Sequence, residues 1–366
     1  MNKGNIMVGN KDLICQEVFK KVGKWGDAVE KREEHNGLDH EQKARGNAGM
    51  LEGITEYWLC VGGANVDVQG VTSARLLPGT SNPGEVHQAA GGVARNVAEN
   101  LGWLGEEVQL FALVGEDADG EWLRQVTANS GVATHGMLRI AGKSTGRYLA
   151  IRDRDGELYT AVADMELNEE WPAEIVQQGL KRLPQAAGLF LDANLPLEVM
   201  RAFLAEARRL DKKIIVDPVS VKKAEKWKGL LEGVHILVAS IDELEVLGGQ
   251  KLHSYNDVEI CAKKLVAEGI HQVMVICGEA GLWLCTAQEE KWLAAPTMPI
   301  RESAGDAFAA GIIYAQNKAL SLTEQAAFGV ALSEMRTKEN GRYDIDALLA
   351  RKDYYAAKER QILDRE

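Results

Sequence analysis

The chain has 366 residues, a formal net charge of −12 and a sequence pI of about 5.3. Apolar residues make up 46% and charged residues 26%, which is the composition of a soluble globular protein with a substantial core. The acidic balance excludes wholesale nucleic-acid binding, which needs a basic face. It leaves small anionic ligands open, because backbone N–H groups bind phosphate without net positive charge.

The cysteines and the start of the chain indicate a cytoplasmic protein. The five cysteines are odd in number and form no C-x-x-C pair, which favours reduced thiols. The N-terminus has no continuous apolar region of the kind found in signal peptides. No run of about 18 apolar residues occurs, so we expect no membrane span.

The first 56 residues differ from the rest because they are highly charged and poor in apolar residues. We expect residues 1–56 to form an N-terminal extension with short helices or loose order. A degenerate winged helix that binds DNA is the alternative. The main domain is predicted over 57–350, and the charged tail 351–366 predicts a solvated helix.

From residue 57 onward, apolar strands and amphipathic helices alternate along the chain. Strands are predicted at 57–61, 107–115, 187–194, 213–220, 234–240 and 272–278, helices at 97–105, 120–131 and 197–211, and hairpins at 145–164 and 283–296. Continuous apolar strands between helices predict a mostly parallel sheet covered on both faces, whereas the period-2 hairpin predicts a smaller, solvated sheet. Ligands of open α/β sheets bind beyond the carboxyl ends of the strands.

Polar side chains follow the first glycine pair of the domain. Asn65 and Asp67 in "GGANVDVQG" (62–70) lie two residues apart, so on a strand they share one face. A carboxylate accepts from two hydroxyls, and an amide both donates and accepts, so this pair can grip vicinal hydroxyls of a sugar. A polar turn is the plainer interpretation of this motif taken alone.

A second glycine pair precedes a predicted helix. In "GGVARNVAENLGWLG" (91–105), Gly91 and Gly92 let a ligand approach the backbone, and Asn96 lies one turn into the helix. A glycine pair alone is typical of a tight turn. The place of Asn96 favours a ligand site.

The stretch "RESAGDAFAAG" (301–311) sets Asp306 among small residues. Ser303, Ala304 and Gly305 can present successive N–H groups as an anion-binding nest, and the start of a helix adds its positive end. Asp306 beside such a nest could take a proton from an attacking hydroxyl. The alternative is that Asp306 is only a helix N-cap.

Two later strands are also followed by polar groups. "ASIDELEVLGG" (239–249) places Ser240 and Glu243 at a helix start, where Glu243 either stabilises the helix or faces magnesium and phosphate. "CGEAGLWLC" (277–285) contains a Gly-x-x-Gly turn that is either plain turn chemistry or a nucleotide loop.

The order of these motifs resembles the ribokinase-like (PfkB) carbohydrate kinases over about residues 57–345. The resemblance rests on a glycine pair then N-x-D, "GGVARN", N/S-x-x-E-x-E, "GEAG" and "AGDAFAAG". "SNPGEVHQAAGGVARN", "STGRYLAI", "AVADMELN", "LDANL" and "IVDPVS" are more similar still to the bacterial pseudouridine kinases of that family.

The resemblance implies a three-layer α/β/α sandwich with a small β-sheet lid, drawn from about 64–90 and 134–165. It implies ATP-dependent phosphorylation of the 5′-hydroxyl of pseudouridine by a homodimer joined through its lids. Another nucleoside or a free sugar, or a catalytically impaired nucleoside-binding regulator, are the alternatives. ATP and Mg²⁺ are the implied cofactors, with a monovalent cation such as K⁺ as a further candidate.

The resemblance also implies roles for individual residues. Asp306 matches the catalytic base, and Ser303, Ala304 and Gly305 match the region of the anion hole. Sugar contacts are implied for Asn65, Asp67, Gly91, Gly92 and Asn96, and lid or base-side contacts for Asn82, Thr145, Asp164 and Asn194. Glu243 matches the magnesium-linked position, and Ser240, Gly278, Glu279 and Gly281 match the nucleotide side.

Two segments depart from the family pattern, the loop before Asp306 and the start of the helix at Ser240. The run "IRESAGDAF" has Ser303 where D-T-x-G-A-G-D-A-F has its first glycine, and Ile300 or Arg301 where aspartate is usual. Serine at a position that needs a positive φ costs roughly 1–2 kcal/mol. Ser240 stands for the usual asparagine. Both changes fall on the phosphate and metal side, so we expect nucleotide affinity and rate to be the properties affected.

Overall fold

The computed structural model describes residues 56–295, 303–335 and 341–358, and every structural statement below concerns these ranges. The predicted extension lies outside them apart from Glu56, as do Ile300, Arg301 and residues 359–366 of the predicted tail. Within the described ranges, no helix is both long enough and apolar enough to cross a membrane.

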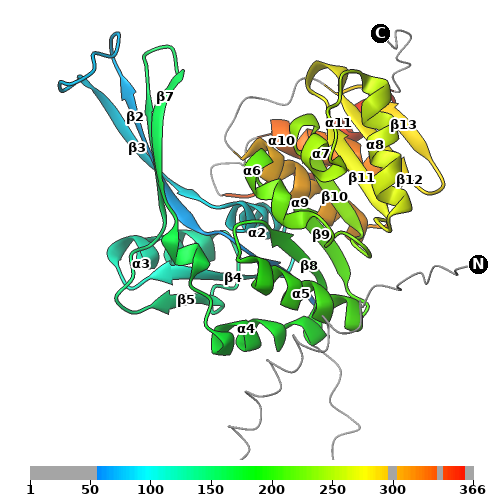
Figure 1. Cartoon of the computed structure of the whole chain (residues 1–366), viewed down its shortest axis with the longest axis horizontal. Helices are drawn as coiled ribbons and strands as arrows, with labels where there is room; N and C mark the ends of the chain where they lie inside the picture. The colour runs from blue at the N-terminus through cyan, green and yellow to red at the C-terminus, as the bar shows by residue number, and fades with distance from the viewer. Residues whose placement is uncertain (1–55, 296–302, 336–340, 359–366) are drawn as a thin grey trace, which may run out of the picture. The chain divides into compact units, whose positions relative to one another are not determined.

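A nine-stranded sheet forms the main body (Figure 1), in the order β13-β12-β11-β10-β9-β8-β1-β4-β5. The strands from β5 to β11 in that order are parallel, and β12 pairs antiparallel with both β11 and β13. The strands are β1 (Tyr57–Val61), β4 (Val108–Gly115), β5 (Met137–Ile140), β8 (Ala186–Asp192), β9 (Lys213–Asp217), β10 (Ile236–Ser240), β11 (Gln272–Ile276), β12 (Leu282–Thr286) and β13 (Glu290–Leu293).

Helices cover both faces of this sheet. In β1, Trp58 and Cys60 pack into one core cluster with α2, α9 and α10, while Leu59 and Val61 pack into another with α4, α5, α7 and α8. The helices are α2 (Val93–Trp103), α3 (Ala118–Asn129), α4 (Ala173–Leu180), α5 (Leu197–Arg209), α6 (Val221–Ala224), α7 (Ile241–Gly248), α8 (Tyr255–Ala267), α9 (Ala304–Asn317), α10 (Leu322–Glu334) and α11 (Ile345–Ala356). Short 3₁₀ helices are η2 (Glu166–Glu169), η3 (Leu183–Gln185), η4 (Glu225–Trp227) and η5 (Gly278–Ala280). The predicted three-layer sandwich is confirmed.

A separate four-stranded sheet forms the lid, in the order β3-β2-β6-β7. Its strands are β2 (Asn65–Thr72), β3 (Gly84–Gly91), β6 (Arg147–Arg152) and β7 (Leu158–Asp164), and Figure 1 shows them as two long hairpins that project from the large sheet. One part of the predicted lid is corrected. Residues 134–165 include β5, which pairs with β4 in the large sheet, because buried Met137 faces the core there.

The prediction of a solvated C-terminal helix is wrong in the described part of that tail. Helix α11 starts at Ile345, before the predicted boundary, and packs on α10 with Leu348 and Tyr355 buried. The Tyr355 hydroxyl donates to Glu334 at 2.6 Å. The sequence signal was weak because only a few apolar residues of α11 face the core.

Candidate active site

Asp306 lies in the first turn of α9, and its carboxylate is buried against α2. Its exposed fraction is 9%, and Asn96 Nδ2 of α2 donates to its Oδ2 at 2.7 Å. The residue at the N-cap position of α9 is Ser303, and no side chain caps the helix there. The interpretation of Asp306 as only an N-cap is therefore wrong.

The pKa of Asp306 is raised to about 7. Burial is the largest cause, and the charges of Asp192 and Asp67 add to it, while the Asn96 hydrogen bond and Arg95 act in the opposite direction. A carboxylate with such a pKa is part ionised and part protonated at neutral pH, which suits a general base.

Arg95 fixes the direction of the Asn96 amide, and the sequence analysis did not identify it. Its guanidinium is almost fully buried, donates to Glu99 at 2.8 and 3.0 Å, and donates to Asn96 Oδ1. Because arginine has only donors, the oxygen of Asn96 faces Arg95 and its nitrogen faces Asp306. The i, i+4 spacing of Arg95 and Glu99 was the signal that could have revealed this pair.

Asn65 and Asp67 begin β2 beside the end of β3, as the shared-face prediction requires. Asn65 Nδ2 donates to Asp67 Oδ1 at 2.6 Å, and Gly91 is the ladder partner of Asn65. A Cβ at Gly91 would lie 2.2 Å from Asp67 Oδ2. At Gly92, where φ is 99°, a Cβ would lie 2.3 Å from the Gly63 carbonyl oxygen. Both glycines are required by close packing around the carboxylate and the turn.

Asp192, at the carboxyl end of β8, joins the segments that carry these side chains. Its fully buried carboxylate accepts from Gly63 N at 3.0 Å, Ala94 N at 2.9 Å and Asn194 N at 2.8 Å. It therefore ties the turn after β1, the start of α2 and the loop after β8 to one point. The sequence analysis missed it, although "LFLD" ends a buried strand on a carboxylate.

Thr145 and Asp164 lie at the base of the lid. The Thr145 hydroxyl donates to Asp117 Oδ1 at 2.6 Å and accepts from Gly115 N at 2.9 Å, so protein partners use it. Asp164 ends β7, and its carbonyl oxygen lies 3.5 Å from an ideal Cβ at Gly146, which would also lie 3.5 Å from the Asn65 Cβ. Asp164 thus borders the Asn65 end of the site, and Thr145 directly precedes Gly146 there.

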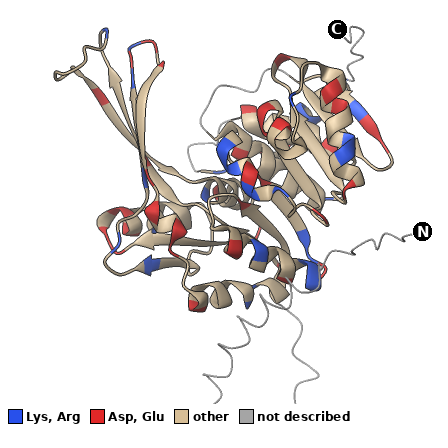
Figure 2. Ribbon diagram, viewed as in Figure 1, with Lys and Arg blue, Asp and Glu red and all other residues tan. Residues whose placement is uncertain are grey.

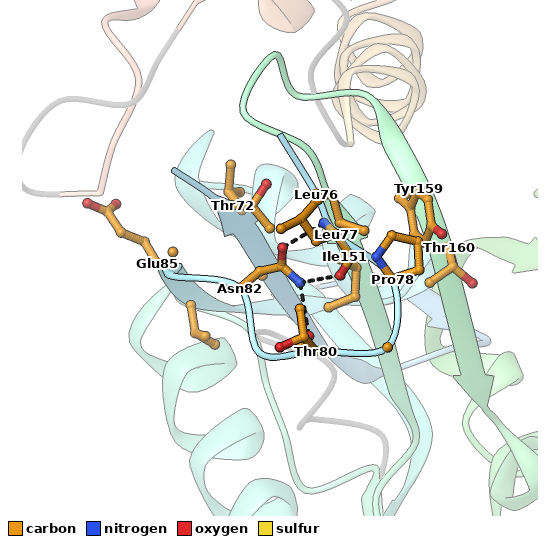
Figure 3. A pocket seen from close by; sticks show the side chains of 15 residues that line it. Thr72, Leu76, Leu77, Pro78, Thr80, Asn82, Glu85, Ile151, Tyr159 and Thr160 are labelled. Atoms are coloured by element: carbon orange, nitrogen blue, oxygen red, sulfur yellow. Dashed lines mark hydrogen bonds between the residues drawn. The ribbon is translucent and has the colours of Figure 1, made fainter. Parts of the chain in front are cut away.

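Asn82 lies at the other end of the lid. Its Oδ1 accepts from Leu77 N at 2.8 Å, and its Nδ2 donates to the carbonyl oxygens of Leu77 and Thr80, as Figure 3 shows. Together these residues line a cavity of about 420 Å³ at the lid tip. Seven residue steps of β3 separate Gly84 from Gly91, roughly 23 Å at 3.3 Å each. The structure does not bring Asn82 to Asp306 within one chain.

The start of α9 has the features of an anion site. Ser303 has a φ of 65°, as its place at the missing glycine predicts. An ideal Cβ at Gly305 would meet no atom of the described residues within 4 Å, so no described side chain or backbone covers Gly305 on that side. The N–H groups of Ala304 and Gly305 have no partner inside a helix that begins here.

The remaining predicted nucleotide residues lie at the carboxyl ends of β10 and β11. Ser240 caps α7, and Glu243 Oε2 accepts from Ser240 N and Oγ, both at 2.9 Å, which is a capping box. Gly278, Glu279 and Gly281 form the η5 turn, where Cys277 N donates to the Gly281 carbonyl oxygen at 2.8 Å.

Asp217, which ends β9, is a further carboxylate at this edge that the sequence analysis missed. Burial and the nearby charges of Asp306, Glu243 and Asp192 hold its pKa well above the usual range. In the described ranges, no group of three or more His, Cys, Asp or Glu side chains could hold a metal ion.

The fold and the site together define an α/β phosphotransferase with a β-sheet lid. Residues 55–346 match the model of the pfkB family carbohydrate kinases, and the chain belongs to that family. It is accordingly a kinase of a sugar or nucleoside that uses ATP.

Three similar proteins illustrate the relationship. The uncharacterized sugar kinase YeiI of Escherichia coli (strain K12) is 34% identical over 75% of this chain and 76% of its own length. The pseudouridine kinase of the same organism is 31% identical over 76% of this chain and 90% of its own length. The structure of Arabidopsis thaliana ribokinase with ribose and ATP covers 81% of this chain and 99% of its own, with a TM-score of 0.69. At 19% identity that likeness concerns the fold, which is ribokinase-like.

Proposed function

We propose that this kinase phosphorylates the 5′-hydroxyl of pseudouridine. The observation that carries the proposal is the buried Asp306, held by Asn96 and close enough to Asp67 for that charge to raise its pKa. The candidate base therefore lies near the Asn65–Asp67 pair, which would bind the hydroxyls of the sugar. The 31% identity to a pseudouridine kinase supports the choice of nucleoside.

In this mechanism Asp306 accepts the proton of the attacking hydroxyl through Oδ1, because Oδ2 accepts from Asn96. The N–H groups at the start of α9 stabilise the negative charge that develops on the transferred phosphoryl group. Asn65 and Asp67 orient the sugar, and closure of the lid excludes water from the reaction.

The nucleotide would lie along the carboxyl ends of β10 and β11, with phosphates at the start of α9. Mg²⁺ usually binds through phosphates, water and one or two carboxylates, and Glu243 is the carboxylate that we assign to it. The capping box uses Glu243 Oε2 and leaves Oε1 for a bound water or the metal. A bound Mg²⁺ would neutralise phosphate charge, and K⁺ is a further cofactor that the proposal includes.

The test is release of ADP from ATP and Mg²⁺ with pseudouridine, uridine, ribose and no acceptor. Pseudouridine-dependent release with the highest kcat/KM supports the proposal. Faster turnover of ribose or uridine would replace it with another nucleoside or sugar kinase. Binding of pseudouridine by calorimetry without ADP release would indicate a nucleoside-binding regulator.

A further inference from the structure

The loop after β8 holds the side chain of Asn194 in a fixed orientation beside Gly63, in the turn that leads from β1 into β2. Asn194 N donates to Asp192 Oδ1 at 2.8 Å, which fixes the backbone of this residue. Its side-chain Oδ1 accepts a hydrogen bond from Lys223 Nζ of α6. Backbone and side chain are therefore held by two different charged groups.

The chemistry of lysine decides which way the amide points. An ammonium group has three donors and no acceptor, so the atom of Asn194 that faces Lys223 is the oxygen. The amide nitrogen then lies on the other side, where an ideal Cβ at Gly63 would be 2.7 Å from it. Gly63 belongs to the turn that leads into Asn65. Within the described ranges, Asn194 Nδ2 donates no hydrogen bond to the protein.

Lys223 is itself held in place. Its N–H donates to the Ser220 side chain that caps α6, and its own side chain is half-buried. Burial lowers its pKa, while the charges of Asp192 and Glu169 raise it and that of Lys226 lowers it. Lys226 Nζ donates to the carbonyl oxygens of Ala193 and Leu195. Lys223 and Lys226 together therefore bind Asn194 and the backbone on both sides of it. Figure 2 shows the positive residues of α6 at this edge of the sheet.

We propose that Lys223 is a positioning residue that fixes the Asn194 amide with its NH₂ group toward the substrate, so that the site selects a hydrogen-bond acceptor there. This rests on the proposed nucleoside kinase function and deepens it. A carbonyl oxygen of the nucleobase accepts a hydrogen bond from the NH₂ group of Asn194. An amino group at the same place on the base would set two hydrogen-bond donors against each other.

The consequence is a preference among nucleosides that share a ring but differ in one group. Inosine and uridine carry a carbonyl where adenosine and cytidine carry an amino group. A site built to donate rejects a donor because both groups stay unpaired on burial. The wild-type enzyme should therefore favour inosine over adenosine and uridine over cytidine, independently of its preference for pseudouridine.

The experiment compares the ratio of kcat/KM within each pair in the wild type and in Lys223→Met. Methionine keeps most of the bulk but has no donor, so the amide is free to rotate and present its oxygen. We expect each ratio to fall about tenfold toward one, the size of one hydrogen-bond preference. General damage to the fold would lower all rates and leave the ratios unchanged.

Two variants sharpen the comparison. Lys222→Met removes the neighbouring, exposed lysine of α6 and should leave the ratios at wild-type values. Lys223→Arg keeps a group with donors only and should keep the preference for the carbonyl members.

The two proposals fail in distinguishable ways. Ratios that stay at wild-type values in Lys223→Met, with nucleoside turnover intact, overturn the role of Lys223 and leave the proposed function in place. If the wild type turns over no nucleoside, dissociation constants for the same pairs give the ratios. If none of these nucleosides binds, both proposals fail together.

Discussion

At the scale of single residues, Asp306 links the electrostatics of the site to the pH dependence of the reaction. A base must be ionised to accept a proton, and the pKa of Asp306 is raised to about 7. We expect kcat/KM to fall roughly tenfold per pH unit below about 7. Asp306→Asn should lower turnover by about 10²–10⁴, and its residual rate should lack this acid limb. Full turnover in the variant would show that another group accepts the proton.

The same carboxylate should make the protein less stable as pH rises. A group whose pKa is higher in the folded than in the unfolded state stabilises the fold below its unfolded pKa, here 3.8, and this contribution is lost as pH rises to about 7. Roughly three pKa units correspond to about 4 kcal/mol. Asp306→Asn should therefore gain stability relative to wild type between pH 4 and 8, as measured by urea unfolding. If the difference in unfolding free energy between the variant and wild type does not change across that pH range, the raised pKa of Asp306 is contradicted.

Ser303 offers a test of backbone strain at the start of α9. A φ of 65° costs a residue other than glycine roughly 1–2 kcal/mol of folded-state stability. Glycine removes this strain, but the greater entropy of glycine in the unfolded chain costs about 0.5–1 kcal/mol. Ser303→Gly should raise the free energy of unfolding slightly and increase kcat/KM for ATP, because glycine lets phosphate approach the nest.

Ala319→Gly is the matched control for this variant. Ala319 has a φ of 53° just beyond the other end of the 14-residue helix α9, roughly 21 Å away. This substitution should raise stability to a similar degree without changing ATP kinetics. Equal ATP kinetics in both variants would place the phosphate elsewhere than residues 303–305.

The residues that we propose to touch a substrate carry local sequence signals, whereas most of those that hold them in place do not. Asn65 and Asp67 follow from strand periodicity, and Asn96 from its distance to a glycine pair. Asp192 and Lys223 act through contacts with segments far away in the chain, so no local spacing predicts their partners. Arg95 was missed although its partner Glu99 is only four residues away. Asp192 and Asp217 could have been found, because each ends a buried parallel strand with a carboxylate, where such sheets bind ligands.

At the scale of secondary-structure elements, Asp192 makes β1, α2 and β8 act as one unit. Asp192→Ala would leave two buried N–H groups, those of Gly63 and Ala94, and the half-buried N–H of Asn194 without their acceptor. We expect a loss of stability on the order of 3–5 kcal/mol. Asp192→Asn keeps a single acceptor oxygen and should fall between wild type and the alanine variant. Glu198→Ala, an exposed change on α5, should stay within about 0.5 kcal/mol in the same unfolding experiment.

Elements with a clear apolar period were predicted close to their bounds, and short or amphipathic ones were not. Strands β4, β8, β10 and β11 appear within two residues of their predicted starts. The four-residue strand β5 was missed as a strand of the large sheet, because so short a segment has too few residues to show a period. The part of α11 from residue 351 onward was predicted as solvated, because its buried Tyr355 stands among charged residues.

At the scale of the whole molecule, the lid has two faces with different chemistry. Asp67 and its ladder partner Ala89 lie on the face that bears the site, and Val68, with partners Gln88 and Leu149, lies on the opposite face. Val86, Leu149 and Val162 share that opposite face with exposed fractions of 74%, 42% and 62%. An exposed apolar sheet face of this kind marks an interaction site.

We therefore expect the lids of two chains to pair through this face and form the homodimer that the family resemblance implies. Val162→Glu would bury a charge in that contact, so sedimentation velocity should show a dimer for wild type and a monomer for the variant. Leu158→Glu introduces the same charge at a similarly exposed position, 48%, on the face that bears Asp67 and should leave the dimer intact. A wild-type monomer at micromolar concentration, or a Val162→Glu dimer as stable as wild type, would exclude this face as the dimer contact. Activity of the monomeric variant would then separate the two roles of the lid, since a lid that only excludes water needs no second copy to do so.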